Sequence, residues 1–347
     1  MTIALPTRKL GSTGIELTTL GFGGASIGNL YKAISDEQAG ATINVALDVG
    51  IRYFDTAPHY GQGLSELRLG RALHQSSHQA PQHVVVSTKV GRVLEPIALP
   101  PLGTERWGFV DGLPYEPVFD YSYDGVMRSF ESSLQRLQVS RVDILFAHDL
   151  GRDTHGQNHE HHWKIFLDGG YRAMCELKAQ GVVRAIGLGV NEWQICMQAL
   201  QDITLDVFLL AGRYTLLEQE ALELFLPECV RRMVSVILGG PFNSGILING
   251  VRGGNVPFYN YAPARAAVIA RVQAIQTICD SHKVPLAAAA LQFPLAHPAV
   301  ISIIPGQASS AQASELNHWF QTTIPASLWT DLRTASLLHA QAPVPTD

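Results

Sequence analysis

The sequence predicts an α/β fold, a closed TIM (β/α)8 barrel with an N-terminal β-hairpin and a long loop after the third strand. Strand-like apolar runs alternate with helical patterns eight times, and eight such units imply a closed parallel sheet. The runs are continuously rich in Val, Ile and Leu, which is typical of strands buried on both faces. A length of 347 residues, with 46% hydrophobic and 16% charged residues, suits one large domain spanning residues 1–347. The eight runs are Leu20–Ala25, Arg52–Ala57, Val84–Val90, Val142–His148, Ala185–Val190, Val207–Ala211, Val234–Gly239 and Val300–Pro305.

Local patterns predict the elements around these strands. Residues Arg8 to Leu17 are expected to form the hairpin, because Ser12-Thr13-Gly14 supplies a turn between two short strands. Apolar residues at helical spacing predict amphipathic helices over Val126–Leu137 and Ala264–Asp280. Such helices would cover the outside of the barrel with their apolar stripes.

The segment Arg92–Tyr121 departs from the simple alternation of strand and helix. It is rich in Pro, Gly and aromatic residues and leaves the chain directly after the third predicted strand. Loops longer than about 15 residues are usually lids or binding loops. Its aromatic residues, Trp107 among them, either pack on the face of a ring-shaped ligand or anchor the loop to the barrel, and the sequence leaves both readings open.

Composition excludes several classes of function. The net charge is −5 and no cluster of Lys and Arg occurs, which argues against nucleic acid or an anionic membrane surface as a partner. No run of 18 apolar residues and no leader-like N-terminus is present. We therefore expect a cytoplasmic protein that acts on a small molecule, with its oligomeric state left open. The four cysteines are widely spaced, which favours free thiols over disulfides.

Four ionisable residues of different type follow predicted strands: Asp55, Tyr60, Lys89 and His148. Each alone is more often a structural ion pair or a core imidazole. Together they form a catalytic layout, because functional groups of parallel barrels gather at the carboxyl ends of the strands. A phenol titrates near pH ~10, so proton transfer by Tyr60 near neutrality requires a neighbouring cation and a carboxylate that holds the cation.

The same residues carry a resemblance to the aldo-keto reductase superfamily, which extends from about Arg8 to about Leu338. The matching words are Gly21-Phe22-Gly23, Asp55-Thr56-Ala57, Tyr60-Gly61, Ser65-Glu66, Ser87-Thr88-Lys89 and Ile304-Pro305-Gly306. The resemblance implies the strand order, a hairpin that caps the N-terminal end of the barrel, and a catalytic tetrad of Asp55, Tyr60, Lys89 and His148. In the reaction it implies, a nicotinamide exchanges hydride with substrate carbon and Tyr60 moves the proton. Lys89 lowers the pKa of Tyr60, Asp55 pairs with Lys89, and His148 orients the substrate oxygen.

The cofactor site is likewise implied by the resemblance, since no trustworthy Gly-x-Gly-x-x-Gly motif follows the first strand. Three departures from the family occur: Gly239 replaces an aromatic residue, Ala211 a glutamine, and Gly306, Gln307 and Gln312 a basic set. Residues 304–316 contain no Lys, Arg or His, so we expect NAD rather than NADP, whose 2′-phosphate favours basic partners. The expected cofactor-binding residues are Gly23, Asn191, Gly240, Phe242, Ser244, Gly245, Leu247, Gly306, Gln307, Gln312 and Glu315.

Within the superfamily the chain is similar to the branch that oxidises sugars at the anomeric carbon, of the D-threo-aldose, L-fucose and L-galactose dehydrogenase type, close to pyridoxal 4-dehydrogenase. The words that carry this similarity are residues 123–129, 209–217, 239–245 and 289–294. We therefore expect oxidation of an aldose to its lactone, with pyridoxal as the alternative substrate. The expected substrate-binding residues are His59, Trp107 and Trp163.

Two alternatives belong to other classes. The loop that contains His155, His159, His161 and His162 could hold zinc in a metal-dependent barrel hydrolase. A hydrolase would place histidines on several strand ends, whereas only His148 does so, and we expect no metal. A catalytically silent scaffold that senses cofactor is the other alternative, and the complete tetrad argues against it.

Overall fold

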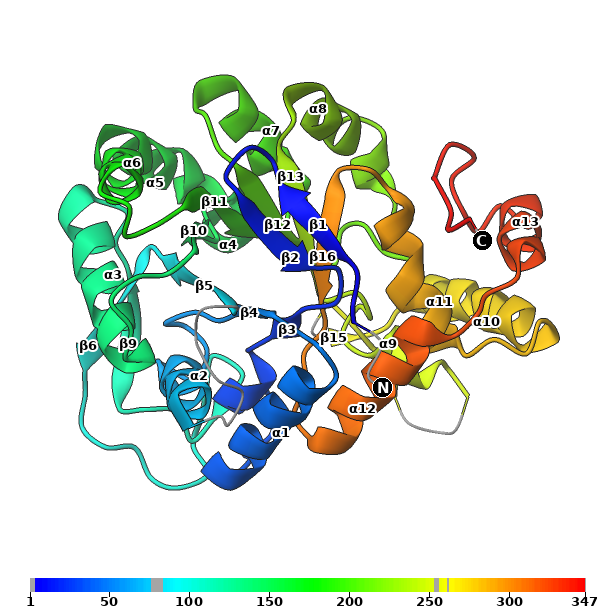
Figure 1. Ribbon diagram of the computed structural model, residues 1–347, viewed down its shortest axis with the longest axis horizontal. Helices are drawn as coiled ribbons and strands as arrows, with labels where there is room; N and C mark the ends of the chain where they lie inside the picture. The colour runs from blue at the N-terminus through cyan, green and yellow to red at the C-terminus, as the bar shows by residue number, and fades with distance from the viewer. Residues whose placement is uncertain (1–3, 76–83, 253–255, 261, 347) are drawn as a thin grey trace.

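A computed structural model describes residues 4–75, 84–252, 256–260 and 262–346. Its centre is an eight-stranded parallel sheet in the order β16-β13-β12-β11-β10-β5-β4-β3. Parallel bridges between Leu20 and Ile303 and between Gly23 and Gly306 join the two edges, so the sheet closes into a barrel (Figure 1). The eight predicted strands are thereby confirmed. They are β3 (Phe22–Gly23), β4 (Tyr53–Asp55), β5 (Val85–Val90), β10 (Ile144–His148), β11 (Ala185–Val190), β12 (Val207–Ala211), β13 (Ser235–Gly239) and β16 (Val300–Ile304).

Strand register brings the carboxyl ends of neighbouring strands together. Asp55 is the partner of Ser87, and Lys89 is the partner of Phe146, two residues before His148. Consecutive residues of a strand face opposite sides of the sheet. The side chains of Asp55, Ser87 and Lys89 therefore point to the same side of the sheet as the side chain of His148. All four lie at one rim of the barrel.

Helices surround the barrel (Figure 1). The helix predicted over 126–137 is α3, which starts at Tyr123 after its cap Ser122 and buries Val126, Phe130 and Leu137. The helix predicted over 264–280 is α10. The larger helices are α1 (Asp36–Asp48), α2 (Leu64–Gln75), α3 (Tyr123–Leu137), α6 (Tyr171–Ala179), α7 (Trp193–Asp202), α8 (Phe225–Arg232), α10 (Ala266–Ser281), α11 (Leu286–Gln292), α12 (Ser310–Gln321) and α13 (Ala326–Thr334). Short helices α4 (Arg152–His155), α5 (His159–Ile165) and α9 (Ile246–Asn249) lie in connections.

The predicted hairpin closes one end of the barrel. Strands β1 (Thr7–Leu10) and β2 (Ile15–Thr18) pair antiparallel, and Figure 1 shows them lying across the strands. Leu10, Ile15 and Leu17 are almost completely buried and belong to one apolar cluster with side chains from the barrel interior. Removing that much apolar surface from water stabilises the closed end.

The long loop after β5 has secondary structure of its own. Strand β6 (Arg92–Pro96) pairs antiparallel with β9 (Tyr115–Phe119), and β7 (Glu105–Arg106) with β8 (Phe109–Val110). The Arg106 guanidinium donates to the carbonyl oxygens of Leu113 and Tyr115, both at 2.6 Å. These contacts hold the loop in a defined shape at the end of the barrel where the strands have their carboxyl ends.

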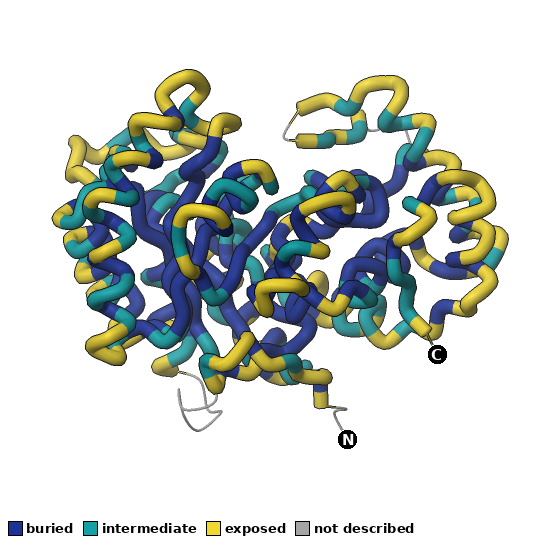
Figure 2. Tube along the Cα trace, turned by 90° about the horizontal axis from the view of Figure 1, so that it is seen from above, coloured by how far each residue is buried: buried dark blue, intermediate teal, exposed yellow. Residues whose placement is uncertain are grey.

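Burial separates the inside of the molecule from its rim. Figure 2 shows buried positions along the strands and the inner helix faces, with exposed positions on the outer turns. The hairpin β14 (Phe258–Tyr259) and β15 (Ala262–Pro263) belongs to the connection after β13. Within the described part of the chain, no helix combines the length and apolar character needed to cross a membrane.

Candidate active site

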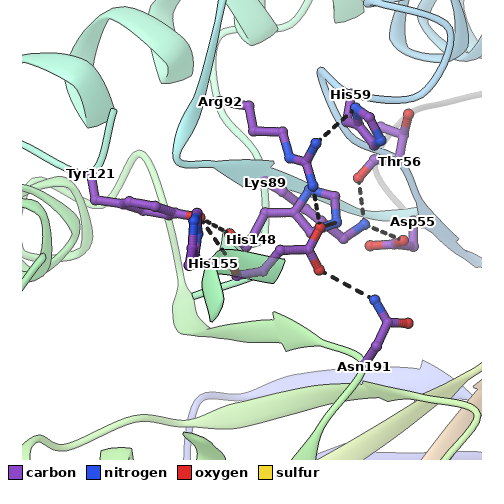
Figure 3. A network of polar contacts seen from close by, with 10 residues as sticks. Asp55, Thr56, His59, Lys89, Arg92, Tyr121, His148, His155 and Asn191 are labelled. Atoms are coloured by element: carbon purple, nitrogen blue, oxygen red, sulfur yellow. Dashed lines mark hydrogen bonds and ion pairs between the residues drawn. The ribbon is translucent and has the colours of Figure 1, made fainter. Parts of the chain in front are cut away.

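A buried ion pair joins the ends of β4 and β5. The Lys89 ammonium donates to Asp55 Oδ2 at 2.6 Å and to the Thr56 carbonyl at 2.9 Å (Figure 3). Ser87 donates to the other Asp55 oxygen at 2.7 Å. Burial alone would lower the pKa of Lys89, but the charges of Asp55 and Tyr60 raise it above its usual value. Lys89 therefore stays positively charged at neutral pH, which is the state that its predicted role beside Tyr60 requires.

Tyr60 lies over this cation, in the turn between β4 and α2. The Lys89 Nζ atom is 4.6 Å from the centroid of the Tyr60 ring. Burial raises the pKa of Tyr60 to about 12, although Lys89 acts in the opposite direction. The expectation that Lys89 lowers the pKa of Tyr60 thus holds for the contribution of Lys89, whereas the net shift is upward because burial disfavours the phenolate.

His148 completes the group at the end of β10. Its ring centroid lies 5.9 Å from that of Tyr60 and 6.0 Å from that of His59. Burial, together with the charges of Lys89 and Arg92, lowers its pKa well below the usual value. A neutral imidazole retains one N–H, so His148 can donate a hydrogen bond to a ligand oxygen without carrying charge.

Buried polar contacts behind the tetrad fix the strand ends. Ser65 donates to the Gly24 carbonyl at 2.7 Å and lies 2.8 Å from the Thr56 hydroxyl. One oxygen of the fully buried Glu66 accepts from Thr88 at 2.6 Å. The other pairs with Arg136 of α3 at 2.6 Å. These bonds lock Thr56 and Thr88, the neighbours of Asp55 and Lys89, in place.

A second buried ion pair lies beside His148, and sequence reasoning missed it. Arg92 at the start of the long loop contacts Asp149 Oδ2 at 2.5 Å, and both side chains are less than 10% exposed. Arg92 also lies 3.3 Å from His59 Nδ1 and 4.4 Å from the centroid of the Phe119 ring. Asp149 directly follows His148, which was the available signal. Its partner lies 57 residues away, a separation that spacing cannot reveal.

Three of the tetrad residues, Tyr60, Lys89 and His148, border a cavity of about 480 Å3, which we call the tetrad cavity. Its outer wall contains Trp107, which is half-exposed, and Phe109, while Asn191 and Asp149 contribute polar atoms. His59 also borders this cavity, and the substrate contacts expected for His59 and Trp107 stay a prediction. Burial and Arg92 lower the pKa of His59 to about 2, so its ring is neutral.

Trp163 lies elsewhere, and its expected role as a substrate wall is not supported. Its indole is 3% exposed and packs against Phe166 at a ring centroid distance of 5.7 Å. The ring nitrogen donates to Asp202 of α7 at 2.9 Å. Trp163 belongs to the apolar packing around α5, because its helix turns it inward rather than toward the rim.

A second cavity of about 270 Å3, the glycine-rich cavity, adjoins the tetrad cavity and shares Tyr60, Asn191 and Ala211 with it. Gly240 and Gly245 have φ values of 55° and 91°, a region that glycine adopts readily. A Cβ atom on Gly23 would lie 2.8 Å from the Ile304 carbonyl oxygen. Seven of the expected cofactor-binding residues line this cavity, namely Gly23, Asn191, Gly240, Phe242, Ser244, Gly245 and Gly306.

This lining fits an extended dinucleotide. Among the described residues that border the glycine-rich cavity, Arg213 supplies a positive charge, which suits a pyrophosphate. Arg213 donates to Asn260 Oδ1 at 3.0 Å. Sequence reasoning used residues 209–217 for the resemblance but assigned Arg213 no role in the cofactor site. Ala211 and Gly239 are register partners and both border the cavity, so the two departures from the family lie side by side.

The other four expected cofactor residues do not border the described cavity. Leu247 is buried in the apolar core. Gln307 is fully buried, and neither of its amide atoms has a hydrogen-bond partner. Gln312 accepts from the Ala308 backbone N–H at 2.8 Å, and Glu315 is exposed on α12. Gln307 directly follows Gly306, and a ligand bound at this loop would supply hydrogen-bond partners for its side-chain amide.

The histidines of the loop that follows β10 contact each other and neighbouring aromatic side chains. The rings of His155 and His162 stand 4.1 Å apart, and His155 Nε2 lies 3.0 Å from the Tyr121 hydroxyl. In the described ranges no three His, Cys, Asp or Glu side chains gather in a way that could hold a metal ion.

Comparisons with known proteins agree with this geometry. The sequence profile of the Aldo/keto reductase family matches residues 19–336. The chain is 47% identical to pyridoxal 4-dehydrogenase of Microbacterium luteolum. The alignment covers 95% of this chain and 97% of the relative. It is 37% identical to D-threo-aldose 1-dehydrogenase of a Pseudomonas species, over 94% and 96% of the two chains. It is 30% identical to L-galactose dehydrogenase of Arabidopsis thaliana, over 89% and 86%.

Among solved structures, an aldo-keto reductase from Bacillus halodurans in its holo form superimposes with a TM-score of 0.74 at 24% identity, covering 99% of both chains. A glycerol dehydrogenase from Gluconobacter oxydans superimposes with a TM-score of 0.73 at 21% identity, covering 98% of this chain and 97% of the other. At these identities the likeness shows a shared fold.

Proposed function

Because the chain belongs to the aldo/keto reductase family, we propose that it is an NAD-dependent dehydrogenase that oxidises the anomeric carbon of an aldopyranose to a lactone. One observation carries this proposal. Tyr60, charged Lys89 and neutral His148 converge on a cavity that adjoins the glycine-rich cavity. A hydride donor and acceptor held in the two cavities would meet beside a proton-transfer group.

The chemistry assigns one task to each residue. A bound nicotinamide supplies the acceptor for the hydride, which leaves the anomeric carbon with the electron pair of its C–H bond. Tyr60 takes the proton of the anomeric hydroxyl, and the electron pair of that O–H bond becomes the new C=O bond. Lys89 stabilises the phenolate, and Asp55 holds Lys89. His148 donates a hydrogen bond to the developing carbonyl oxygen.

The proposed preference for NAD rests on the loop after β16. Hydrogen bonds between uncharged groups hold the turn from Gly306 to Gln312. The Ala308 backbone N–H donates to the Gln312 side chain, and the Ala308 carbonyl accepts from the Gln38 side chain. Arg252, in the connection that follows α9, is paired with Asp280 of α10. A 2′-phosphate, which carries about −2 charge, would find no basic partner at this loop.

Pyridoxal is the second candidate substrate, and the 47% identity to a pyridoxal 4-dehydrogenase favours it. Pyridoxal carries a hydroxymethyl group next to its aldehyde and can close to a cyclic hemiacetal, so its oxidation to a lactone is the same chemical step. The polar atoms of His59, Asp149 and Asn191 in the tetrad cavity favour an aldose, because a ring with several hydroxyls uses more of them.

The experiment is a turnover assay of the purified protein with NAD. Formation of NADH is followed with L-fucose, L-galactose and pyridoxal, and the lactone product is identified by mass. We expect turnover of at least one aldose. Turnover of pyridoxal alone would replace the substrate and keep the hydride-transfer assignment, and absence of turnover with all three would contradict the proposal.

A further inference from the structure

Asp149 borders the tetrad cavity beside His148, and the proposed hydride transfer assigns no role to its carboxylate. Its Oδ2 atom lies 3.4 Å from His148 Nε2. Its Oδ1 atom accepts from Asn191 Nδ2 at 3.4 Å, and Asp149 borders the cavity. His148 and Asn191, both labelled in Figure 3, thus contact different oxygens of this carboxylate. The carboxylate therefore stands beside the group that would bind the reacting oxygen.

The protein fixes this carboxylate firmly. Asp149 has a φ of 54°, a conformation that costs a non-glycine residue free energy and persists only where surrounding contacts determine it. Its backbone N–H donates to the Gly189 carbonyl at 2.9 Å, and Tyr121 donates to its carbonyl at 3.1 Å. Arg92 pairs with its side chain from behind. The main chain and the ion pair together aim the carboxylate at the cavity.

The carboxylate also keeps capacity to accept hydrogen bonds. Two carboxylate oxygens offer about four acceptor sites. Arg92 makes the short contact at 2.5 Å, whereas the contacts from His148 and Asn191, both 3.4 Å, are longer than the roughly 2.7–2.9 Å of a strong charged bond. Oδ2 carries the short bond from Arg92, whereas Oδ1 has only the 3.4 Å contact from Asn191, so a hydroxyl donor from the cavity would find an acceptor in Oδ1.

We propose that Asp149 determines substrate specificity by accepting a hydrogen bond from the hydroxyl group next to the oxidised carbon. This inference rests on the proposed function. Oxygens on adjacent ring carbons lie about one hydrogen-bond length, roughly 3 Å, apart. A substrate whose reacting oxygen meets His148 thus brings its neighbouring hydroxyl to Asp149. The substrate class is a hemiacetal with a hydroxyl close to the reacting oxygen: the 2-hydroxyl of an aldose, on the neighbouring carbon, or the phenolic hydroxyl of pyridoxal, one carbon farther along.

The test compares each substrate with its deoxy analogue. The ratio of kcat/KM for L-fucose over 2-deoxy-L-fucose is measured in the wild type, Asp149→Ala and Asp149→Asn. We expect a wild-type ratio of about 100 or more, since a site built to bond a hydroxyl rejects the analogue that lacks it. Asp149→Ala is expected to reduce the ratio to about threefold or less, and Asp149→Asn to an intermediate value.

The ratio separates recognition from structural damage. Loss of Asp149 also leaves Arg92 unpaired, but that loss slows both sugars and cancels in the ratio. Asp143→Asn is the matched control, because Asp143 pairs with Arg184 at 3.0 Å near the amino end of the same strand. It is expected to keep the wild-type ratio.

Two outcomes overturn the inference while the proposed function stands: a wild-type ratio near one, or an unchanged ratio in both Asp149 variants. The wild-type ratio is measured on the unaltered protein, so this part of the test does not depend on whether a variant folds. If pyridoxal is oxidised instead of aldoses, the pair becomes pyridoxal and 3-deoxypyridoxal with the same expectations. If no hemiacetal is oxidised, the proposed function fails and this inference fails with it.

Discussion

The ammonium group of Lys89 lies 4.6 Å from the centre of the Tyr60 ring, beneath the face of the phenol. Asp55 holds the other side of the ammonium at 2.6 Å. The cation is therefore fixed before any ligand arrives, and it needs no rearrangement to stabilise negative charge on Tyr60. This relationship between a buried cation and a phenol underlies the first three predictions.

Tyr60→Phe is expected to bind NAD like the wild type and to lose turnover by about 10²–10⁴-fold, because only the proton-transfer oxygen is removed. Steady-state kinetics and cofactor binding by fluorescence quenching measure both quantities. Activity above about a tenth of wild type would show that another group moves the proton.

Lys89→Met is expected to abolish turnover and to lower the free energy of unfolding by about 3–5 kcal/mol, because Asp55 would remain buried without its partner. Urea denaturation measures the loss. Lys178→Met is the control, since the Lys178–Asp206 pair is partly exposed; its loss should stay near about 1 kcal/mol or below. Equal losses in the two variants would argue against a special role for the buried pair.

The rate of oxidation is expected to rise with pH between about pH 7 and about pH 10. Tyr60 must be a phenolate to accept a proton, and burial holds its pKa at about 12, so the basic fraction grows as pH rises toward that value. The neutral His148, with its lowered pKa, adds no further change in this range. A pH profile of kcat with saturating NAD tests the sign, and a flat or falling profile would contradict it.

Wild-type protein is expected to prefer NAD, and Gln312→Arg to shift the preference toward NADP by about tenfold or more, because a charged bond to phosphate is worth roughly 1.5–3 kcal/mol. The kcat/KM values for both cofactors give the ratio. Gln321→Arg places the same charge at the far end of α12 and should leave the ratio unchanged. A wild-type preference for NADP would remove the basis of the proposal.

The two tryptophans are expected to behave differently. Trp107→Ala should raise KM for the sugar with little change in stability, because Trp107 is 53% exposed at the cavity wall. Trp163→Ala should cost about 3–5 kcal/mol of stability, since a large buried side chain is lost, and should leave KM unchanged. Thermal unfolding and saturation curves on both variants check this, and the reverse assignment would restore Trp163 as a substrate residue.

The strands and the tetrad were predictable because both depend on local patterns. Continuous apolar runs such as Val84–Val90 mark strands buried on both faces, and barrel topology places residues at their ends on one rim. Lys89 and Asp55 each sit at such an end, so their approach follows from the fold.

The Arg92–Asp149 pair and the burial of Trp163 were not predictable, for a physical reason. Arg92 reaches Asp149 because β6 and β9 fold the long loop back over the rim, and that path depends on tertiary contacts. Trp163 lies inward because the connection between β10 and α6 folds into short helices whose facing is set by packing. A run of aromatic and histidine residues carries no periodicity that tells the two orientations apart.

The hairpin that seals the amino end of the barrel separates the apolar contacts that hold this end closed from the rim loops that border the two cavities. Leu10, Ile15 and Leu17 belong to the apolar cluster at the closed end, while the rim loops at the opposite end border the two cavities. Changes in the rim loops leave the apolar contacts at the closed end unchanged, so new specificities can evolve without loss of folding. That separation offers a route by which relatives named for a vitamin aldehyde and for sugars share one scaffold.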